Sequence, residues 1–103
     1  MALTHSSREE IELLVDTYNQ RYPEAINLSS KYFYGETQST MSEITEFNEN
    51  FLVVSSISLT KKKENKFKFS QKIKTSEEFQ SNLILLLIQA REKAPGSEPV
   101  SYT

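Results

Sequence analysis

The residue types that usually carry catalysis or bind metals are scarce in this sequence. It has no cysteine and a single histidine, His5. A Ser–His–Asp triad, a thiolate metal site and a histidine-rich metal centre are therefore disfavoured. With two glycines in all, the chain also has no phosphate-cradling loop and no dinucleotide-binding fingerprint. We expect a protein that is not an enzyme.

Two pairs of adjacent carboxylates, Glu9/Glu10 and Glu77/Glu78, are the remaining candidates for acid–base chemistry. Each pair falls in the first turn of an expected helix, where a carboxylate accepts from free backbone N–H groups and suits the helix dipole. Helix capping therefore explains both pairs without catalysis. Four tyrosines cluster around the two expected N-terminal helices, and we expect them to pack in the core with their hydroxyls at the surface. They are Tyr18, Tyr22, Tyr32 and Tyr34.

The stretch from Lys66 to Lys93 organises the rest of the chain. Apolar Phe67, Phe69 and Ile73 alternate with lysines, which predicts a strand over 66–74 with one buried and one exposed face. Thr75-Ser76-Glu77-Glu78 then predicts a helix start with a capping box. Apolar residues follow at the spacing of one helix face. These are Phe79, Leu83, Leu86, Leu87 and Ala90.

Helix-capping residues, proline, glycine and runs of β-branched residues predict the elements that come earlier in the chain. Ser6 or Ser7 is expected to cap a first helix, and Pro23 to begin a second one that ends at Gly35. A short or bulged strand is expected over 39–47, a turn over 48–50, a clear strand over 51–59 and a basic turn over 60–65. The predicted class is α+β, in the order α-α-β-β-β-α, with a three-stranded antiparallel meander covered on one face by helices.

Residues 1–94 are expected to form one domain, and 95–103 a disordered tail. The longest apolar run, Leu83–Ile88, has six residues, too few for a membrane span. The N-terminal sequence lacks the basic start and apolar run of a signal peptide. We therefore expect a cytoplasmic protein, or one of an organelle stroma.

Charge is segregated along the chain. Three basic and nine acidic residues give 1–60 a net charge of −6, whereas seven lysines and one glutamate give 61–74 a net of +6. The lysines could meet an acidic partner, or they could protect an edge strand from aggregation and form a solvated turn. Nucleic-acid binding is disfavoured because no aromatic-plus-basic motif accompanies them. The lysines concerned are Lys61, Lys62, Lys63, Lys66 and Lys68.

The last helix has more apolar surface than one core needs. Ile84, Leu85 and Ile88 fall outside its main apolar stripe. Either the helix is central in the domain or has a normal, partly apolar surface, or these residues form a second interface. The interface would join two copies of the chain in a homodimer or bind another protein. Burying each side chain would contribute about 1.5–3 kcal/mol before the costs of association.

Several local strings, in their order, resemble the small α/β domain of haem-iron-utilisation proteins of the HugZ type, which belong to the pyridoxamine-phosphate-oxidase-like group. That domain also occurs alone in cyanobacterial Domain Related to Iron proteins and at the end of the plant glutamyl-tRNA-reductase-binding protein. The resemblance covers roughly 11–93. It rests on the string Thr17–Ala25, on Tyr34-Gly35, and on the strand-to-helix passage from Phe67 to Arg91.

The departures from that family concern the haem ligands. In its haem-binding members, histidines in the first helix and near the end of the last strand hold the iron. Here the first region has Thr17 and Tyr22, and the second has Gln71. Threonine and glutamine are poor axial ligands, so only a phenolate of Tyr22 or Tyr18 could replace a histidine. Alternation places Gln71 inward, either satisfied by backbone or facing a ligand.

Three functions remain open from the sequence. The first is an interaction module related to haem, iron or tetrapyrrole metabolism that acts by protein contact and has no bound cofactor. The second is a haem or tetrapyrrole binder with a remodelled pocket, in which Lys72 or Arg21 pairs with propionates. The third is an accessory subunit of a larger complex, which docks by charge complementarity. The second would use Thr17, Tyr18, Tyr22, Gln71 and Lys72.

Overall fold

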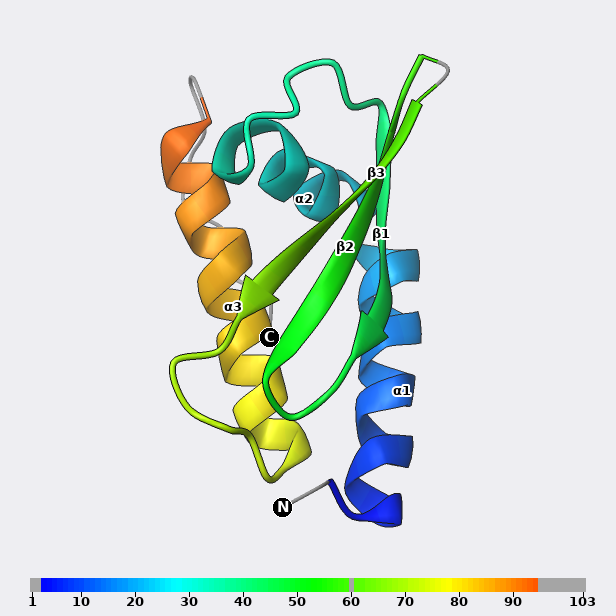
Figure 1. The fold of residues 1–103 in the computed structure, drawn as a ribbon, viewed down its shortest axis with the longest axis vertical. Coiled ribbons are helices and arrows are strands. Elements are labelled where there is room, and N and C mark those ends of the chain that lie inside the picture. The colour runs from blue at the N-terminus through cyan, green and yellow to red at the C-terminus, as the bar shows by residue number, and fades with distance from the viewer. Residues whose placement is uncertain (1–2, 60, 95–103) are drawn as a thin grey trace.

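The computed structural model describes residues 3–59 and 61–94. The predicted tail after residue 94 lies outside these ranges. The order of elements is the predicted α-α-β-β-β-α, with a short π-helical segment, η1, extending the second helix (Figure 1). The elements are α1 (His5–Arg21), α2 (Pro23–Leu28), η1 (Ser29–Phe33), β1 (Met41–Phe47), β2 (Phe51–Ser58), β3 (Lys61–Lys68) and α3 (Ser76–Lys93).

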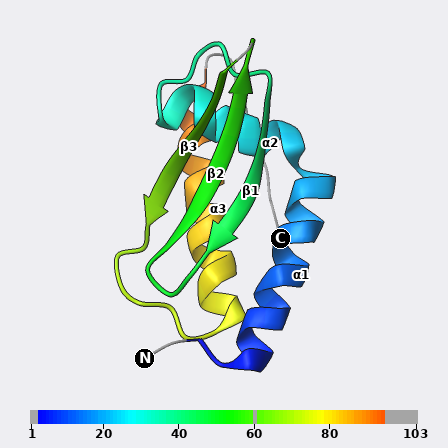
Figure 2. The ribbon, with the colours of Figure 1, turned by 45° about the vertical axis from the view of Figure 1, so that its right-hand side comes forward.

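The three strands form an antiparallel meander in the order β1-β2-β3. The register of β1 against β2 shifts between Ile44 and Glu46, which confirms the predicted irregularity in this strand. Figures 1 and 2 show α2 and α3 crossing behind the sheet and α1 running beside β1. The helices therefore cover one face of the sheet, and among the described residues no helix or strand covers the other face.

The long helix α3 supplies much of the core. All five apolar positions predicted for its inner face are at most 1% exposed. Its start is the predicted capping box: Thr75 Oγ1 accepts from Glu78 N at 3.2 Å, and Glu78 Oε1 accepts from Thr75 N at 3.2 Å. The sheet contributes Ile44, Leu52 and Val54 to the same core.

The first helix begins earlier than predicted. Thr4 caps it by accepting from Ser7 N at 3.1 Å, so neither Ser6 nor Ser7 is the cap. His5 lies in the first turn, where its Nε2 is 2.7 Å from the Glu9 carboxylate. The second helix does begin at Pro23, and Gly35 follows the helical segment with a φ of 77°, as a helix-ending glycine should.

The third strand is displaced from its predicted position. β3 spans Lys61–Lys68, so the basic turn expected over 60–65 is wrong. Its lysines form an edge strand instead, which pairs with β2 along its whole length. Phe69 and Ile73 are buried as predicted, but they lie beyond the strand and bond through their N–H groups to Asn50 O and Glu49 O.

In the described part of the chain, no helix is long and apolar enough to cross a bilayer.

Candidate functional site

The residues predicted on the first helix have separate structural roles. Thr17 is exposed, and its hydroxyl donates to Leu13 O of the same helix at 2.8 Å. Tyr18 is 2% exposed, and its hydroxyl accepts from Gln80 Nε2 of α3 at 3.1 Å. The Tyr22 ring lies 5.2 Å from the Tyr18 ring at a tilt of 48°. Tyr18 thus joins α1 to α3, and Tyr22 beside it is half-buried.

Gln71 and Lys72 lie in the loop between β3 and α3, and both are exposed. The inward direction predicted for Gln71 is wrong. Alternation assumed that the strand continued to residue 74, whereas β3 ends at Lys68. The two residues line a shallow groove of about 250 Å³ together with Glu77 and other residues of the first turns of α3.

The structure does not bring Tyr22 and Gln71 into one site. Tyr22 lines a different groove, of about 440 Å³, which includes Arg91 near the C-terminal end of α3. Gln71 shares its groove with Glu78, near the N-terminal end of that helix. At 1.5 Å per residue, Glu78 and Arg91 are about 20 Å apart along the helix axis. One haem therefore cannot take axial ligands from both regions of a single chain.

The donor set is also a poor fit for haem iron. Neither a threonine hydroxyl nor a glutamine amide is a usual axial ligand, which leaves the phenols of Tyr18 and Tyr22. Tyr18 is buried and its hydroxyl already accepts from Gln80, so Tyr22 is the more accessible of the two. Within residues 3–59 and 61–94, no cluster of three or more His, Cys, Asp and Glu side chains could hold a metal ion. The residues present do not fit a haem held by two axial ligands.

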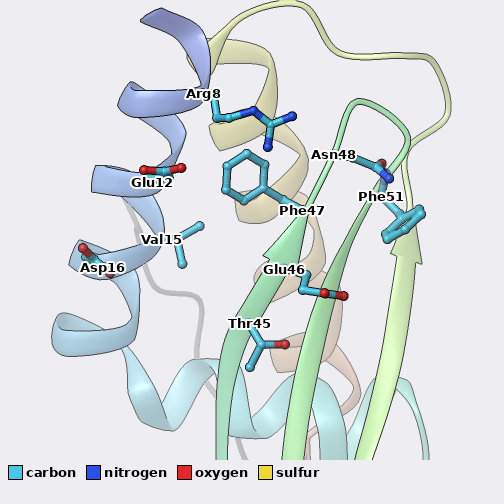
Figure 3. Close-up of a pocket in the computed structure, with 9 residues that line it drawn as sticks. All are labelled: Arg8, Glu12, Val15, Asp16, Thr45, Glu46, Phe47, Asn48 and Phe51. Atoms are coloured by element: carbon cyan, nitrogen blue, oxygen red, sulfur yellow. The ribbon is translucent and has the colours of Figure 1, made fainter. Parts of the chain in front are cut away.

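A third groove, larger than the other two, was not predicted from the sequence. It lies between α1 and the β1–β2 hairpin and has a volume of about 520 Å³ (Figure 3). Glu12, Asp16 and Glu46 give it an acidic wall, and Arg8 lies 5.6 Å over the Phe47 ring at one end. Its three carboxylates make the lining mainly acidic, which would favour a cationic group.

The apolar surface of α3 is smaller than predicted. Leu85 is 47% exposed and Ile88 is 37% exposed, but Ile84 packs against the core. Leu85 and Ile88 are three residues apart and so are neighbours on the helix surface. Two adjacent apolar side chains are common on a protein surface, so they indicate at most a small contact.

The two edges of the sheet differ in their hydrogen bonding. On the β1 edge, Asn19 of α1 donates from Nδ2 to Ile44 O at 3.0 Å and accepts at Oδ1 from Ile44 N at 2.8 Å. Ile44 therefore turns its backbone away from β2. Its opposite residue, Val54, must then bond to β3, where it pairs with Asn65.

That pairing fixes which backbone groups of β3 are left over. Residues 61, 63, 65 and 67 bond to β2, so their alternate neighbours point their N–H and C=O groups away from the sheet. In the described residues, no hydrogen bond reaches these outer groups from another element. We call this row the open edge. It consists of Lys62, Glu64, Lys66 and Lys68.

The lysines predicted to meet an acidic partner lie mostly on this edge. Lys61, Lys62, Lys66 and Lys68 are exposed, and no ion pair in the described part of the chain involves them. Lys63 is different, because its ammonium lies 2.7 Å from the Glu36 carboxylate. The Lys66 ammonium lies 4.6 Å from the centre of the Phe51 ring, at the end of the sheet where β2 begins.

Comparison with known proteins identifies the fold but no family. No protein-family model matches the chain, and no curated protein matches it in sequence. Among solved structures, a haem-binding protein from Mycobacterium smegmatis matches with a TM-score of 0.69 at 9% sequence identity. The match covers 79% of this chain and 34% of that one. The chain thus spans about a third of that protein's length and shares the fold of a small α/β region within it.

Proposed function

We propose that this chain is a non-enzymatic protein-interaction module, built on a fold that it shares with a haem-binding protein. The observation that carries the proposal is the open edge of β3, where four alternate residues have backbone groups that no described element pairs. An unpaired strand edge is the usual template for binding another chain. The separation of Tyr22 from Gln71 supports the same function, because it removes the site expected for bound haem.

A haemin titration followed by absorbance tests the proposal against haem binding. Wild-type protein should show no saturable one-to-one Soret shift. Any weak shift should be the same in Tyr22→Phe and Gln71→Ala variants, because adventitious haem does not depend on those side chains. A saturable shift that weakens in either variant would overturn the proposal.

Haem binding through a tyrosine is the second candidate, and the solved haem-binding neighbour favours it. Tyr22 lines its groove together with Arg21 and Arg91. A phenolate is a known axial ligand, and guanidinium groups pair well with propionates. Loss of the Soret shift in Tyr22→Phe, with Gln71→Ala unchanged, would identify this form of binding. Lys72 cannot supply the propionate contact, because it lines the other groove.

The α3 surface offers a separate test of self-association or subunit assembly. If Leu85 and Ile88 lie in an interface, Ile88→Asp should shift the sedimentation of the protein to that of a monomer while its circular dichroism stays unchanged. Leu13→Asp is the matched control, because Leu13 is also an exposed apolar residue on a helix. Equal behaviour of both variants and the wild type would mean that this patch is ordinary surface.

A further inference from the structure

The open edge has a charge that selects its partner. We propose that it takes an extended acidic segment of another protein as a fourth strand beside β3, an inference that rests on the proposed function. The backbone groups of Lys62, Glu64, Lys66 and Lys68 would form the new ladder. Carboxylates of the segment would then lie next to the lysine side chains on the uncovered face of the sheet.

The charge of the strand argues against a second copy of this chain. Two β3 strands placed side by side would bring their lysine rows together, and like charges across neighbouring strands are destabilising. Glu64 is the only acid between Lys61 and Lys68, so it cannot neutralise this repulsion. The acidic strand of a second copy, β1, is not available either, because Asn19 already bonds both backbone groups of Ile44 at its edge.

The core-facing side chains of β3 indicate which residues the segment should turn toward the core. On the core face of the sheet, Phe67 is half-buried, and its ring meets that of Phe33 edge-on at 5.8 Å. The amide Nδ2 of Asn65 is buried beside them in the strand and has no partner among the described residues. A fourth strand would cover this partly exposed aromatic pair. Its inward residues should therefore be apolar, so the segment should alternate acidic and apolar residues.

Nucleic acid is a weaker fit for the same lysines. Base stacking needs exposed aromatic faces, and the aromatic ring nearest to the lysines on this face, Phe51, is only half-exposed with Lys66 over it. Phosphate contacts would also leave the row of backbone carbonyls unpaired, because phosphates accept hydrogen bonds and cannot donate them. A strand of protein satisfies donors and acceptors together.

Amide hydrogen exchange of the whole chain provides the test. The probe is a capped peptide of alternating Glu and Val, matched to the eight residues of β3. A peptide of alternating Lys and Val, and a thymidine oligonucleotide of equal length, are the controls. The Glu–Val peptide should slow exchange at residues 62, 64, 66 and 68 by about tenfold, with residues 63, 65 and 67 changed little because they already bond to β2. Neither control should do so.

Two variants separate the backbone from the charge. Lys66→Pro removes an outward N–H together with the charge, and it should lower affinity for the Glu–Val peptide by about tenfold. Lys66→Ala removes the charge alone and should lower it by about two- to threefold. Equal losses in both variants, or binding without protection of the four outer amides, would overturn strand addition. So would equal binding of the oligonucleotide, or no binding of the Glu–Val peptide.

These outcomes are distinct from failure of the proposed function. That function fails if haemin binds saturably and in a manner sensitive to Tyr22→Phe or Gln71→Ala, whatever the peptide does. If haemin does not bind and the outer amides stay unprotected, strand addition alone is rejected. Unchanged circular dichroism of Lys66→Pro is required in each case, and it is expected because the lost N–H does not belong to the ladder with β2.

Discussion

The two edge strands of the sheet are protected in different ways. At β1, a side chain from another element completes the hydrogen bonding: Asn19 bonds both backbone groups of Ile44. Above it, Asn27 of α2 accepts from the Ser39 and Ser42 hydroxyls, which fastens α2 to the start of the strand. At β3, within the described residues, no side chain does the same, and lysines line the edge instead.

The β1 edge is closed to every incoming strand at Ile44, whereas the β3 edge is protected only against strands of some charges. The Asn19 hydrogen bonds occupy both outward backbone groups of Ile44, so an incoming strand of any sequence finds no free group there. The lysines of β3 repel an incoming strand that is basic, but they attract one that is acidic. The polar atoms follow the same division. The β1 side has a connected network of Asn27, Ser30, Ser39 and Ser42, whereas the amide nitrogen of Asn65 in β3 is buried without a described partner.

Proline substitutions along β3 should give the largest difference in stability, because they test which backbone groups face β2 and which face outward. Asn65→Pro removes a ladder hydrogen bond with Val54 and should lower the free energy of unfolding by about 3 kcal/mol. Lys66→Pro removes an outward N–H and should cost less than about 1 kcal/mol. Urea unfolding followed by circular dichroism measures both. Similar losses in the two variants would mean that the assignment of outward groups, and so the open edge itself, is wrong.

Removing the closure of the β1 edge should have the next largest effect. Asn19→Ala leaves the N–H and C=O of Ile44 without partners in a part-buried position and should cost about 2–3 kcal/mol. Asn82→Ala is the matched control, because that amide donates to Glu78 O of its own helix in a solvent-exposed hydrogen bond. It should change stability by less than about 0.5 kcal/mol. If Asn19→Ala also costs so little, water replaces the amide and the edge is not closed by it.

A pH dependence should appear at Tyr34, which ends the helical segment η1. Burial raises the pKa of Tyr34 from 10.0 to about 12. The unfolded chain therefore loses this proton at lower pH than the folded chain, so stability is complete below pH 10 and falls as pH rises from 10 to 12. The loss should be about 2 kcal/mol. Denaturant unfolding at a series of pH values measures it, and in Tyr34→Phe the loss over this window should shrink by that amount.

Local sequence patterns predict the elements well because helices and strands follow from neighbouring residues. The capping box at Thr75, the helix start at Pro23 and the irregular β1 strand needed only a few adjacent positions. The start of β3 was missed because a run of lysines and polar residues has the composition of a turn. Only its pairing with β2 makes Lys61–Lys63 a strand.

The sites were harder to predict because they depend on contacts between distant residues. Asn19 and Ile44 are 25 positions apart, and nothing in the local sequence of either residue indicates that they bond. The predicted haem ligands failed for a similar reason. The resemblance placed Tyr22 and Gln71 in one site. The sequence did not show that Tyr22 lies beside the C-terminal end of α3 and Gln71 beside its N-terminal end. The inward direction of Gln71 depended on where β3 ends, and strand ends are the least certain feature of a sequence reading.

The smallest expected difference concerns two buried serines on opposite faces of the sheet. Ser42 Oγ lies 2.8 Å from Ser30 Oγ and 2.9 Å from Asn27 Oδ1, whereas Ser55 is 3% exposed and its hydroxyl has no described partner. Ser42→Ala should therefore cost about 1 kcal/mol, because Asn27 loses a donor. Ser55→Ala should cost nothing or stabilise slightly, because it removes a polar group that is desolvated without compensation. Thermal unfolding of the two variants measures the difference in sign. A clear loss of stability in Ser55→Ala would show that the Ser55 hydroxyl does have a hydrogen-bond partner. The difference between the two sides of the sheet would then concern only the backbone groups at the edges of β1 and β3.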